Sequence, residues 1–205
     1  MEQAPRAFDG SKRVIPWDHW YHCMGHTYGT WLPGEPKGFR TRHHREHVEG
    51  DYRNPPPKGT YDGLHEYSKR AMKREPVFLD PVQRRRALEE LVASLQRRSL
   101  DVRVFSVDRV HLHGLVRVPD HDPKRWIGVA KKESSHCKQT GHAPQGGIWA
   151  TGCKCLPVTD RAHYESVARY IRDHAKKGAA VWESRQAPEV NSGLDSFHPD
   201  SLLVE

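Results

Sequence analysis

The run from Val110 to Val118 alternates apolar and polar residues and carries His111, Leu112 and His113 in its first half. Successive side chains of a β-strand point to opposite faces, so both histidines lie on one face and Leu112 on the other. Two imidazoles about 7 Å apart on one face can approach a single metal ion. The run therefore predicts a strand with a buried face and a histidine face. A metal site on that histidine face needs a third ligand and a reacting group.

Both missing groups are expected on a helix predicted from 161 to about 177, with Asp160 as its N-cap and Gly178 at its end. Tyr170 and His174 are four residues apart and therefore share one face of this helix, about 6 Å apart. One can supply a reacting oxygen and the other a third ligand, because a metal or base activates a tyrosine hydroxyl. Taken alone, the histidine pair also fits two half-exposed histidines on a sheet face, and Tyr170 also fits a core tyrosine near the end of an amphipathic helix.

The order of the other predicted elements indicates an α+β fold. They are a strand at 19–28, a helix at 81–98, strands at 102–107 and 110–118, a helix at 123–138 and a strand at 148–157. Asp80 precedes Pro81 as a helix N-cap would, and Asp108-Arg109 has the length of a hairpin connection. The order βαββαβ is typical of a ferredoxin-like, palm-type antiparallel sheet with helices packed on one face. The histidine pair is expected on the open face.

The predicted domain organisation is a flexible N-terminus at 1–18, a single domain at 19–183 and a disordered tail at 184–205. A proline-rich insertion at 29–67 follows the first strand and contains the basic run RTRHHREH. Long loops inside a domain are usually functional or disordered. The insertion is expected either to contact DNA phosphates or to be a solvated surface excursion.

Composition narrows the class of partner. The net charge of +7 and the pI near 9.3 favour an anionic partner, most often nucleic acid. The mean hydropathy of -0.85 agrees with a chain that has no run of 18 apolar residues, so no membrane span is expected. No signal peptide and no disulfide framework among the four cysteines are apparent. The expected location is the cytoplasm, in association with the nucleoid.

Several stretches then carry a family resemblance. They are YGTWLPGEPKGF, PVFLDPVQR, the HLH strand and IWATGCKCLPVTDRAHYESVARYIRDHAKKG, which together span residues 20–182 with small breaks. The chain resembles the HUH single-tyrosine transposases, and more closely their REP-associated tyrosine transposase-like branch. Two positions depart from the pattern: His174 stands where Gln is common, and Val110 stands where Asn often precedes the first histidine.

The resemblance implies a DNA transposase, a single-strand endonuclease and strand transferase. His111, His113 and His174 would bind Mg²⁺ or Mn²⁺, and Tyr170 would form a covalent 5′-phosphotyrosine and release a 3′-hydroxyl. Single-stranded or hairpin DNA would be the partner, no small-molecule cofactor is needed, and a homodimer is left open. The basic residues assigned to DNA are Arg40, Arg42, Arg45, Arg117, Arg172, Lys176 and Lys177.

Three alternatives stay open. The first is a catalytically silent, domesticated protein that only binds single-stranded nucleic acid. The second is a metal-dependent hydrolase that uses the same three histidines with water as nucleophile. The third concerns a cysteine and histidine group that either binds structural zinc or consists of ordinary free thiols. Its members are His136, Cys137, His142, Cys153 and Cys155.

Overall fold

A five-stranded sheet, in the order β6-β1-β5-β4-β7, forms the centre of the computed structural model. All four pairs of neighbouring strands are antiparallel. The strands are β1 (Trp20–His26), β4 (Asp101–Val107), β5 (His111–Arg117), β6 (Lys154–Pro157) and β7 (Ala180–Glu183). The structure describes residues 17–35, 39–40, 47–48, 57–136 and 146–185. The order β6-β1-β5-β4 is the ferredoxin-like order, so the predicted α+β fold is confirmed, with β7 added at the β4 edge.

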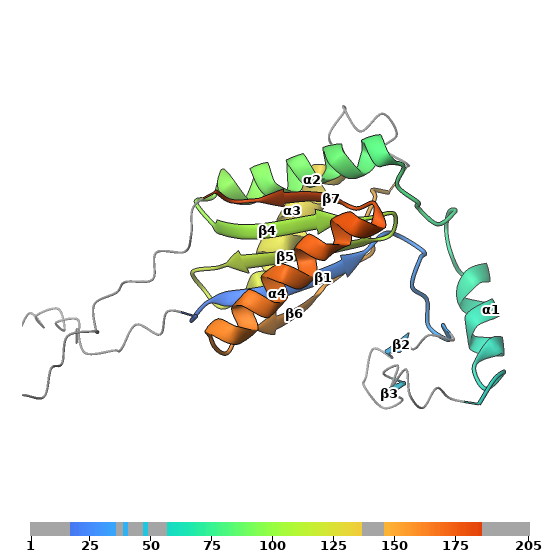
Figure 1. The fold of residues 1–205 in the computed structure, drawn as a ribbon. Helices are drawn as coiled ribbons and strands as arrows, with labels where there is room; N and C mark the ends of the chain where they lie inside the picture. The colour runs from blue at the N-terminus through green and yellow to red at the C-terminus, as the bar shows by residue number, and fades with distance from the viewer. Residues whose placement is uncertain (1–16, 36–38, 41–46, 49–56, 137–145, 186–205) are drawn as a thin grey trace, which may run out of the picture.

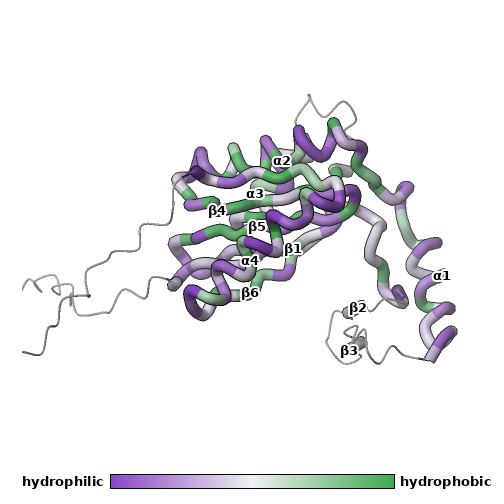
Figure 2. The backbone as a smooth tube through the Cα atoms, viewed as in Figure 1, coloured by the Kyte–Doolittle hydropathy of each residue, from purple (hydrophilic) through white to green (hydrophobic). Residues whose placement is uncertain are grey.

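Two helices cover one face of the sheet. They are α2 (Pro81–Gln96), which runs along the top of the sheet in Figure 1, and α3 (Pro123–His136), which lies behind the sheet in that view. Asp80 caps α2 as predicted, because its carboxylate accepts a hydrogen bond from the Gln83 amide while the Gln83 side chain accepts one from the Asp80 amide. Leu91 and Leu95 of α2 pack with Phe105 and Leu112 in the main core. Figure 2 shows this apolar layer along the inner side of the helices and the central strands.

The opposite face is covered in part by α4 (Arg161–Asp173), which crosses in front of the strands in Figure 1. A smaller core of Trp20, Val104, Leu115 and residues of α4 fills the space between them. At Asp173 the helix tightens into a 3-10 turn, η2 (His174–Lys177). Gly178 then ends it in the left-handed conformation, at φ 83°, as predicted.

The β4–β5 hairpin fixes which residues face α4. Leu112 and Val116 belong to the core beneath α2 and α3, whereas Leu115 belongs to the core beneath α4. By strand alternation His111 and His113 share the α4 face with Leu115. The predicted division of this strand into a buried face and a histidine face is therefore confirmed.

The end of the predicted insertion folds into a helix that the sequence pattern does not suggest. This helix, α1 (Asp62–Arg70), has no buried residue and no side-chain N-cap hydrogen bond, so it lacks the apolar stripe that periodicity analysis detects. Acidic Asp62 begins it, Lys69 and Arg70 end it, and Lys69 pairs with Glu66 at 2.8 Å, all of which favour a solvated helix. Two short strands, β2 (Phe39–Arg40) and β3 (His47–Val48), pair with each other.

Two strand predictions differ from the structure. The strand expected at 148–157 is regular only from Lys154, because Gly152 adopts a positive φ of 78° and interrupts the extended chain. Strand β7 lies just before the predicted tail and was not expected, because its pairing with β4 is a long-range contact. The terminal segments 1–16 and 186–205, predicted to be flexible, lie outside the described residues. In the described part of the chain, no helix combines the length and the apolar character needed to cross a membrane.

Candidate active site

Helix α4 brings Tyr170 and His174 to the histidine face. Tyr164, Val167, Ala168 and Ile171 form its buried stripe, at the 3–4 residue spacing of one helix face. His174 continues that stripe and is buried, with 8% of its surface exposed. Tyr170 lies beside the stripe and is 49% exposed, so its ring borders the site and solvent at once.

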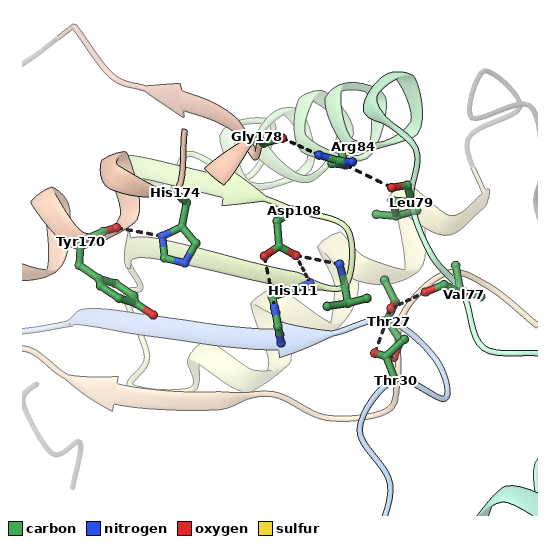
Figure 3. Close-up of polar contacts among 11 residues, drawn as sticks. Thr27, Thr30, Val77, Leu79, Arg84, Asp108, His111, Tyr170, His174 and Gly178 are labelled. Carbon is green, nitrogen blue, oxygen red and sulfur yellow. Dashed lines mark hydrogen bonds and ion pairs between the residues drawn. The ribbon is translucent and has the colours of Figure 1, made fainter. Parts of the chain in front are cut away.

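Tyr170, His174 and His113 form a cluster of three rings. The centroid of the His113 ring lies 4.6 Å from that of His174 and 5.4 Å from that of Tyr170. The Tyr170 and His174 rings are 4.7 Å apart, edge to face. The Nδ1–H of His174 donates to the backbone carbonyl of Tyr170 at 2.9 Å, which leaves Nε2 with its lone pair (Figure 3). A strand residue and two helix residues distant in sequence are thus adjacent.

His111 is held by the hairpin turn. The Asp108 carboxylate accepts hydrogen bonds from the backbone amides of Val110 and His111, at 2.7 and 2.6 Å, and lies 3.3 Å from Nδ1 of His111 (Figure 3). Burial alone would raise the pKa of Asp108, but these hydrogen bonds hold it well below its usual range. An ionised Asp108 keeps the Nδ1–H tautomer of His111 and directs Nε2 away from the turn. Asp108 therefore shapes the turn that precedes His111.

His22 of β1 is a fourth histidine at the site that sequence reasoning did not select. Its Nε2 lies 3.3 Å from Nδ1 of His113, and its ring meets the Tyr170 ring edge to face at a centroid distance of 5.9 Å. The pattern of β1 places His22 on one face with Trp20, and Trp20 packs against α4. The sequence alone does not show how β1 pairs with β5. In the structure Met24 is directly opposite His113, and His22, two residues earlier on β1, is therefore the diagonal neighbour of His113.

Burial keeps two of these imidazoles neutral. It lowers the pKa of His113 to about 3, with a further contribution from the neighbouring His174 and His22. It lowers the pKa of His22 to about 4. At neutral pH both rings are therefore uncharged, which is the state that metal ligation requires.

The predicted ligand set suits a divalent ion in its chemistry. His111 and His174 each have Nδ1 engaged by an oxygen atom, which is the outer-shell arrangement typical of metal-bound histidine. Three imidazoles favour Mn²⁺ over Mg²⁺, because Mg²⁺ prefers oxygen ligands. The three histidines are spaced more widely than the ligands around a bound metal ion. The ligand atoms of His111, His113 and His174 are not all within 4.8 Å of one another.

One three-residue group in the described chain does meet that spacing. Asp18, His19 and His121 place their ligand atoms within 4.8 Å of one another, and this group could hold a metal ion. It lies away from Tyr170, at the start of β1 and in the turn that follows β5.

The basic residues assigned to DNA are distributed over several surfaces. Arg172 of α4 forms an ion pair with Glu183 of β7, with Nε 3.0 Å from Oε2. Lys176 pairs with Asp173 at 2.7 Å, and Lys177 is exposed in η2. These side chains and Tyr170 lie on the same α4–η2 segment.

The remaining assigned residues lie elsewhere. Arg117 stands four residues after His113 on β5, with Nη1 3.8 Å from Asp101 Oδ2. Arg40 belongs to β2, and its side chain is not described. Arg42 and Arg45 lie outside the described residues.

The cysteine and histidine group is described only in part, because Cys137 and His142 lie outside the described residues. Cys153 lies just before β6 and Cys155 lies within it, and their Sγ atoms are 3.5 Å apart. The hydrogen bond with Cys155 and burial raise the pKa of Cys153, so it is a thiol at neutral pH. The zinc site stays a prediction.

No protein-family model and no curated protein matches the chain. Among solved structures, a transposase is similar. It is a REP-associated tyrosine transposase bound to a REP hairpin, with 12% sequence identity and a TM-score of 0.41. The match covers 86% of this chain and 74% of that chain.

Proposed function

We propose that the chain is a metal-dependent tyrosine transposase that cuts and rejoins single-stranded DNA through a covalent 5′-phosphotyrosine. The observation that supports it best is the contact of a half-exposed Tyr170 with His113 and His174 on one sheet face. A nucleophile beside a set of imidazoles that can hold a metal ion is the arrangement that phosphodiester transfer without a nucleotide cofactor needs. The sequence resemblance adds the substrate class, single-stranded DNA at hairpin-flanked sites.

In the proposed reaction the Tyr170 oxygen attacks the scissile phosphorus. The Tyr170 O–P bond forms, the bond from phosphorus to the 3′-oxygen breaks, and the 5′ end stays on the protein. Because Tyr170 is 49% exposed, its phenol proton leaves to solvent, and the departing 3′-oxygen takes a proton from water. Attack of a 3′-hydroxyl from another strand reverses these steps and completes the transfer.

The other side chains have supporting roles in this proposal. His111, His113 and His174 would hold Mn²⁺ or Mg²⁺, which supplies Lewis-acid polarisation of the phosphate when bound. Asp108 orients His111, and the Tyr170 carbonyl orients His174. Lys176 and Lys177 lie next to His174 in η2 and would contact phosphates flanking the scissile bond. Arg172 would join them by exchanging its Glu183 partner for DNA.

The test is a denaturing gel of wild type and Tyr170→Phe with end-labelled single-stranded hairpin DNA, with Mn²⁺ or with EDTA. We expect a metal-dependent protein–DNA adduct that Tyr170→Phe abolishes, because phenylalanine keeps the packing and removes the attacking oxygen. Tyr67→Phe is the matched control, since Tyr67 is also exposed, at 66%, but lies on α1.

Two other results would favour the alternatives. Cleavage that survives in Tyr170→Phe would mean that water is the nucleophile, as in a metal-dependent hydrolase. A tight gel shift without cleavage, by wild type on several hairpins with Mn²⁺, would favour the catalytically silent nucleic-acid-binding protein.

A further inference from the structure

A second cluster of metal-ligating side chains lies where β1 begins and β5 ends. Asp18 and His19 precede β1, and His121 belongs to the turn between β5 and α3. The ligand atoms of the three side chains lie within 4.8 Å of one another, and the two imidazole rings stack at a centroid distance of 3.8 Å. None of these residues takes part in the proposed DNA chemistry.

The hydrogen bonds of His19 determine which of its nitrogens is available. Its Nδ1 lies 2.8 Å from the Val118 carbonyl oxygen, which can only accept, so Nδ1 carries the proton. With Nδ1 engaged, Nε2 is the ring nitrogen left for another partner, and it lies 3.4 Å from Asp18 Oδ2. These two atoms are therefore placed to share a proton, as an ion pair, or a metal ion.

The 3.4 Å between His19 Nε2 and Asp18 Oδ2 also fits two ligands of one metal ion. Ligands about 2.0–2.2 Å from a tetrahedral Zn²⁺ are about 3.4 Å apart. His121 is oriented by a hydrogen bond between its Nδ1 and the Tyr21 hydroxyl, at 3.0 Å. Metal-bound histidines are typically held by such an outer-shell hydrogen bond. Tyr21 packs on the core beneath α2 and α3, so the cluster is anchored on the sheet face opposite Tyr170.

The backbone also holds the two histidines in an unusual way. His19 has a φ of 69° and His121 a φ of 55°, both in the left-handed region that residues other than glycine rarely adopt. Such conformations persist where surrounding structure enforces them, and they cluster at functional sites. Here the His19 carbonyl accepts a hydrogen bond from the Val118 amide, which fixes His19 beside the end of β5.

We infer that Asp18, His19 and His121 form a second metal site, which binds a Zn²⁺-class ion and ties the start of β1 to the β5–α3 turn. Two imidazoles and one carboxylate suit Zn²⁺, Co²⁺ or Ni²⁺ and disfavour Mg²⁺ and Ca²⁺. The fourth position is left for water, since Asp18 and His121 are exposed. The site is independent of the proposed transposase reaction.

The experiment uses the full chain carrying His111→Gln and His113→Gln, so that the histidines near Tyr170 do not contribute. After dialysis against EDTA, Zn²⁺ binding is measured by isothermal titration calorimetry and the melting temperature is measured with and without Zn²⁺. Adding His121→Asn should remove one equivalent of bound Zn²⁺ and the associated rise in melting temperature. His65→Asn is the matched control, because His65 also lies near a carboxylate, 3.8 Å from Glu35.

The inference is overturned if the stoichiometry and the melting shift are the same with and without His121→Asn. It is also overturned if the starting variant binds no Zn²⁺, in which case Asp18 and His19 form an ion pair only. Should His121→Asn unfold without metal, Asp18→Asn replaces it, since this variant keeps the volume of the side chain and removes the charge. The same loss of one equivalent is expected.

Discussion

At the scale of single residues, His22 links two functional side chains. Its Nε2 is 3.3 Å from Nδ1 of His113, and its ring contacts Tyr170. If His113 binds metal through Nε2, its Nδ1 carries the proton and donates to His22. His22 then fixes the tautomer and orientation of His113 without touching the DNA, which makes it a positioning residue in the proposed reaction.

We therefore expect His22→Gln to lower the DNA cleavage rate by about 10–100-fold, the usual effect of removing an outer-shell partner. The Mn²⁺ concentration needed for half-maximal cleavage should rise, while the adduct should still form at Tyr170. Both are read from single-turnover cleavage across a Mn²⁺ series, with His163→Gln on α4 as control. A normal Mn²⁺ dependence in His22→Gln would leave His22 with a packing role only.

The residues that sequence reasoning brought together are those whose spacing is local. Tyr170 and His174 are one helical turn apart, and His111 and His113 are on one strand face, so periodicity alone pairs them. His22 depends on a strand pairing across about ninety positions of sequence, which no local pattern contains. The metal roles of these residues, and the nucleophilic role of Tyr170, stay predictions.

At the scale of elements, the β4–β5 hairpin is shaped by one close approach. A Cβ atom on Gly114 would lie 2.6 Å from Cδ2 of Phe105, the residue paired with it on β4. Phe105 is fully buried and belongs to the core beneath α2 and α3. The missing side chain of Gly114 therefore makes room for the fully buried Phe105 ring, and Gly114 lies next to His113.

Gly114→Ala should destabilise the protein by about 1–3 kcal/mol, because Phe105 has to move within a packed core. Gly128→Ala is the control in which the added Cβ meets no neighbour. Gly128 is exposed on α3, and no atom lies within 4 Å of the added Cβ. There the helix gains about 0.5–1 kcal/mol. Urea denaturation of the three proteins gives both values, and equal stability of Gly114→Ala and wild type would contradict the packing argument.

Ion pairs connect helix α3 to the end of helix α2. Glu133 of α3 accepts hydrogen bonds from Arg98, after the end of α2, and its Oε2 also lies 2.9 Å from Nη2 of Arg97. The hydrogen bonds from Arg98 above all lower the pKa of Glu133 to about 2. Because the folded-state pKa is below the ordinary value of 4.5, this stabilisation is complete above pH 4.5 and is lost as the pH falls to about 2.

Glu133→Gln should thus reduce the free energy of unfolding by about 1 kcal/mol at neutral pH, a value limited by solvent exposure of the pair. The difference from wild type should shrink below pH 4.5 and vanish near pH 2. Denaturant titrations at several pH values test this. Glu165→Gln, which breaks the exposed pair with Arg161, should give a smaller difference, and a pH-independent difference for Glu133→Gln would exclude the charge explanation.

The elements also differ in how well the sequence predicts them. Helices α2 and α4 each bury a largely apolar stripe and begin at an Asp N-cap, so local signals suffice for them. Helix α1 buries nothing, and β7 is four residues long and depends on β4. Neither is detectable from periodicity, because the first lacks it and the second is too short.

At the scale of the whole molecule, β7 closes the β4 edge of the sheet. It pairs with β4 along Val104 to Val107, and its Glu183 forms ion pairs with Arg103 of β4 and Arg172 of α4. Val181 packs against the core on the α4 face and Trp182 against the core on the other face. The strand therefore joins both layers that cover the sheet.

A chain ending at Ala179 should lose about 3 kcal/mol of stability relative to one ending at Arg185, from the apolar contacts of Val181 and Trp182. For a domain of this size, the melting temperature should fall by about 6–12 °C. The shorter chain should also self-associate, because β4 becomes an open edge. Thermal melts and light scattering test both effects, and identical melts would show that β7 contributes little.

The place of α4 in the chain order has a consequence for how the protein is made. Strands β1, β4, β5 and β6, with helices α2 and α3, are all complete before residue 160, whereas Tyr170 emerges afterwards. On the ribosome, the histidine-bearing sheet can assemble before Tyr170 is synthesised. A gene that acquires an early stop codon in this region would encode the histidine-bearing sheet without Tyr170, so under the proposed mechanism the cutting of DNA would be lost while the sheet remained.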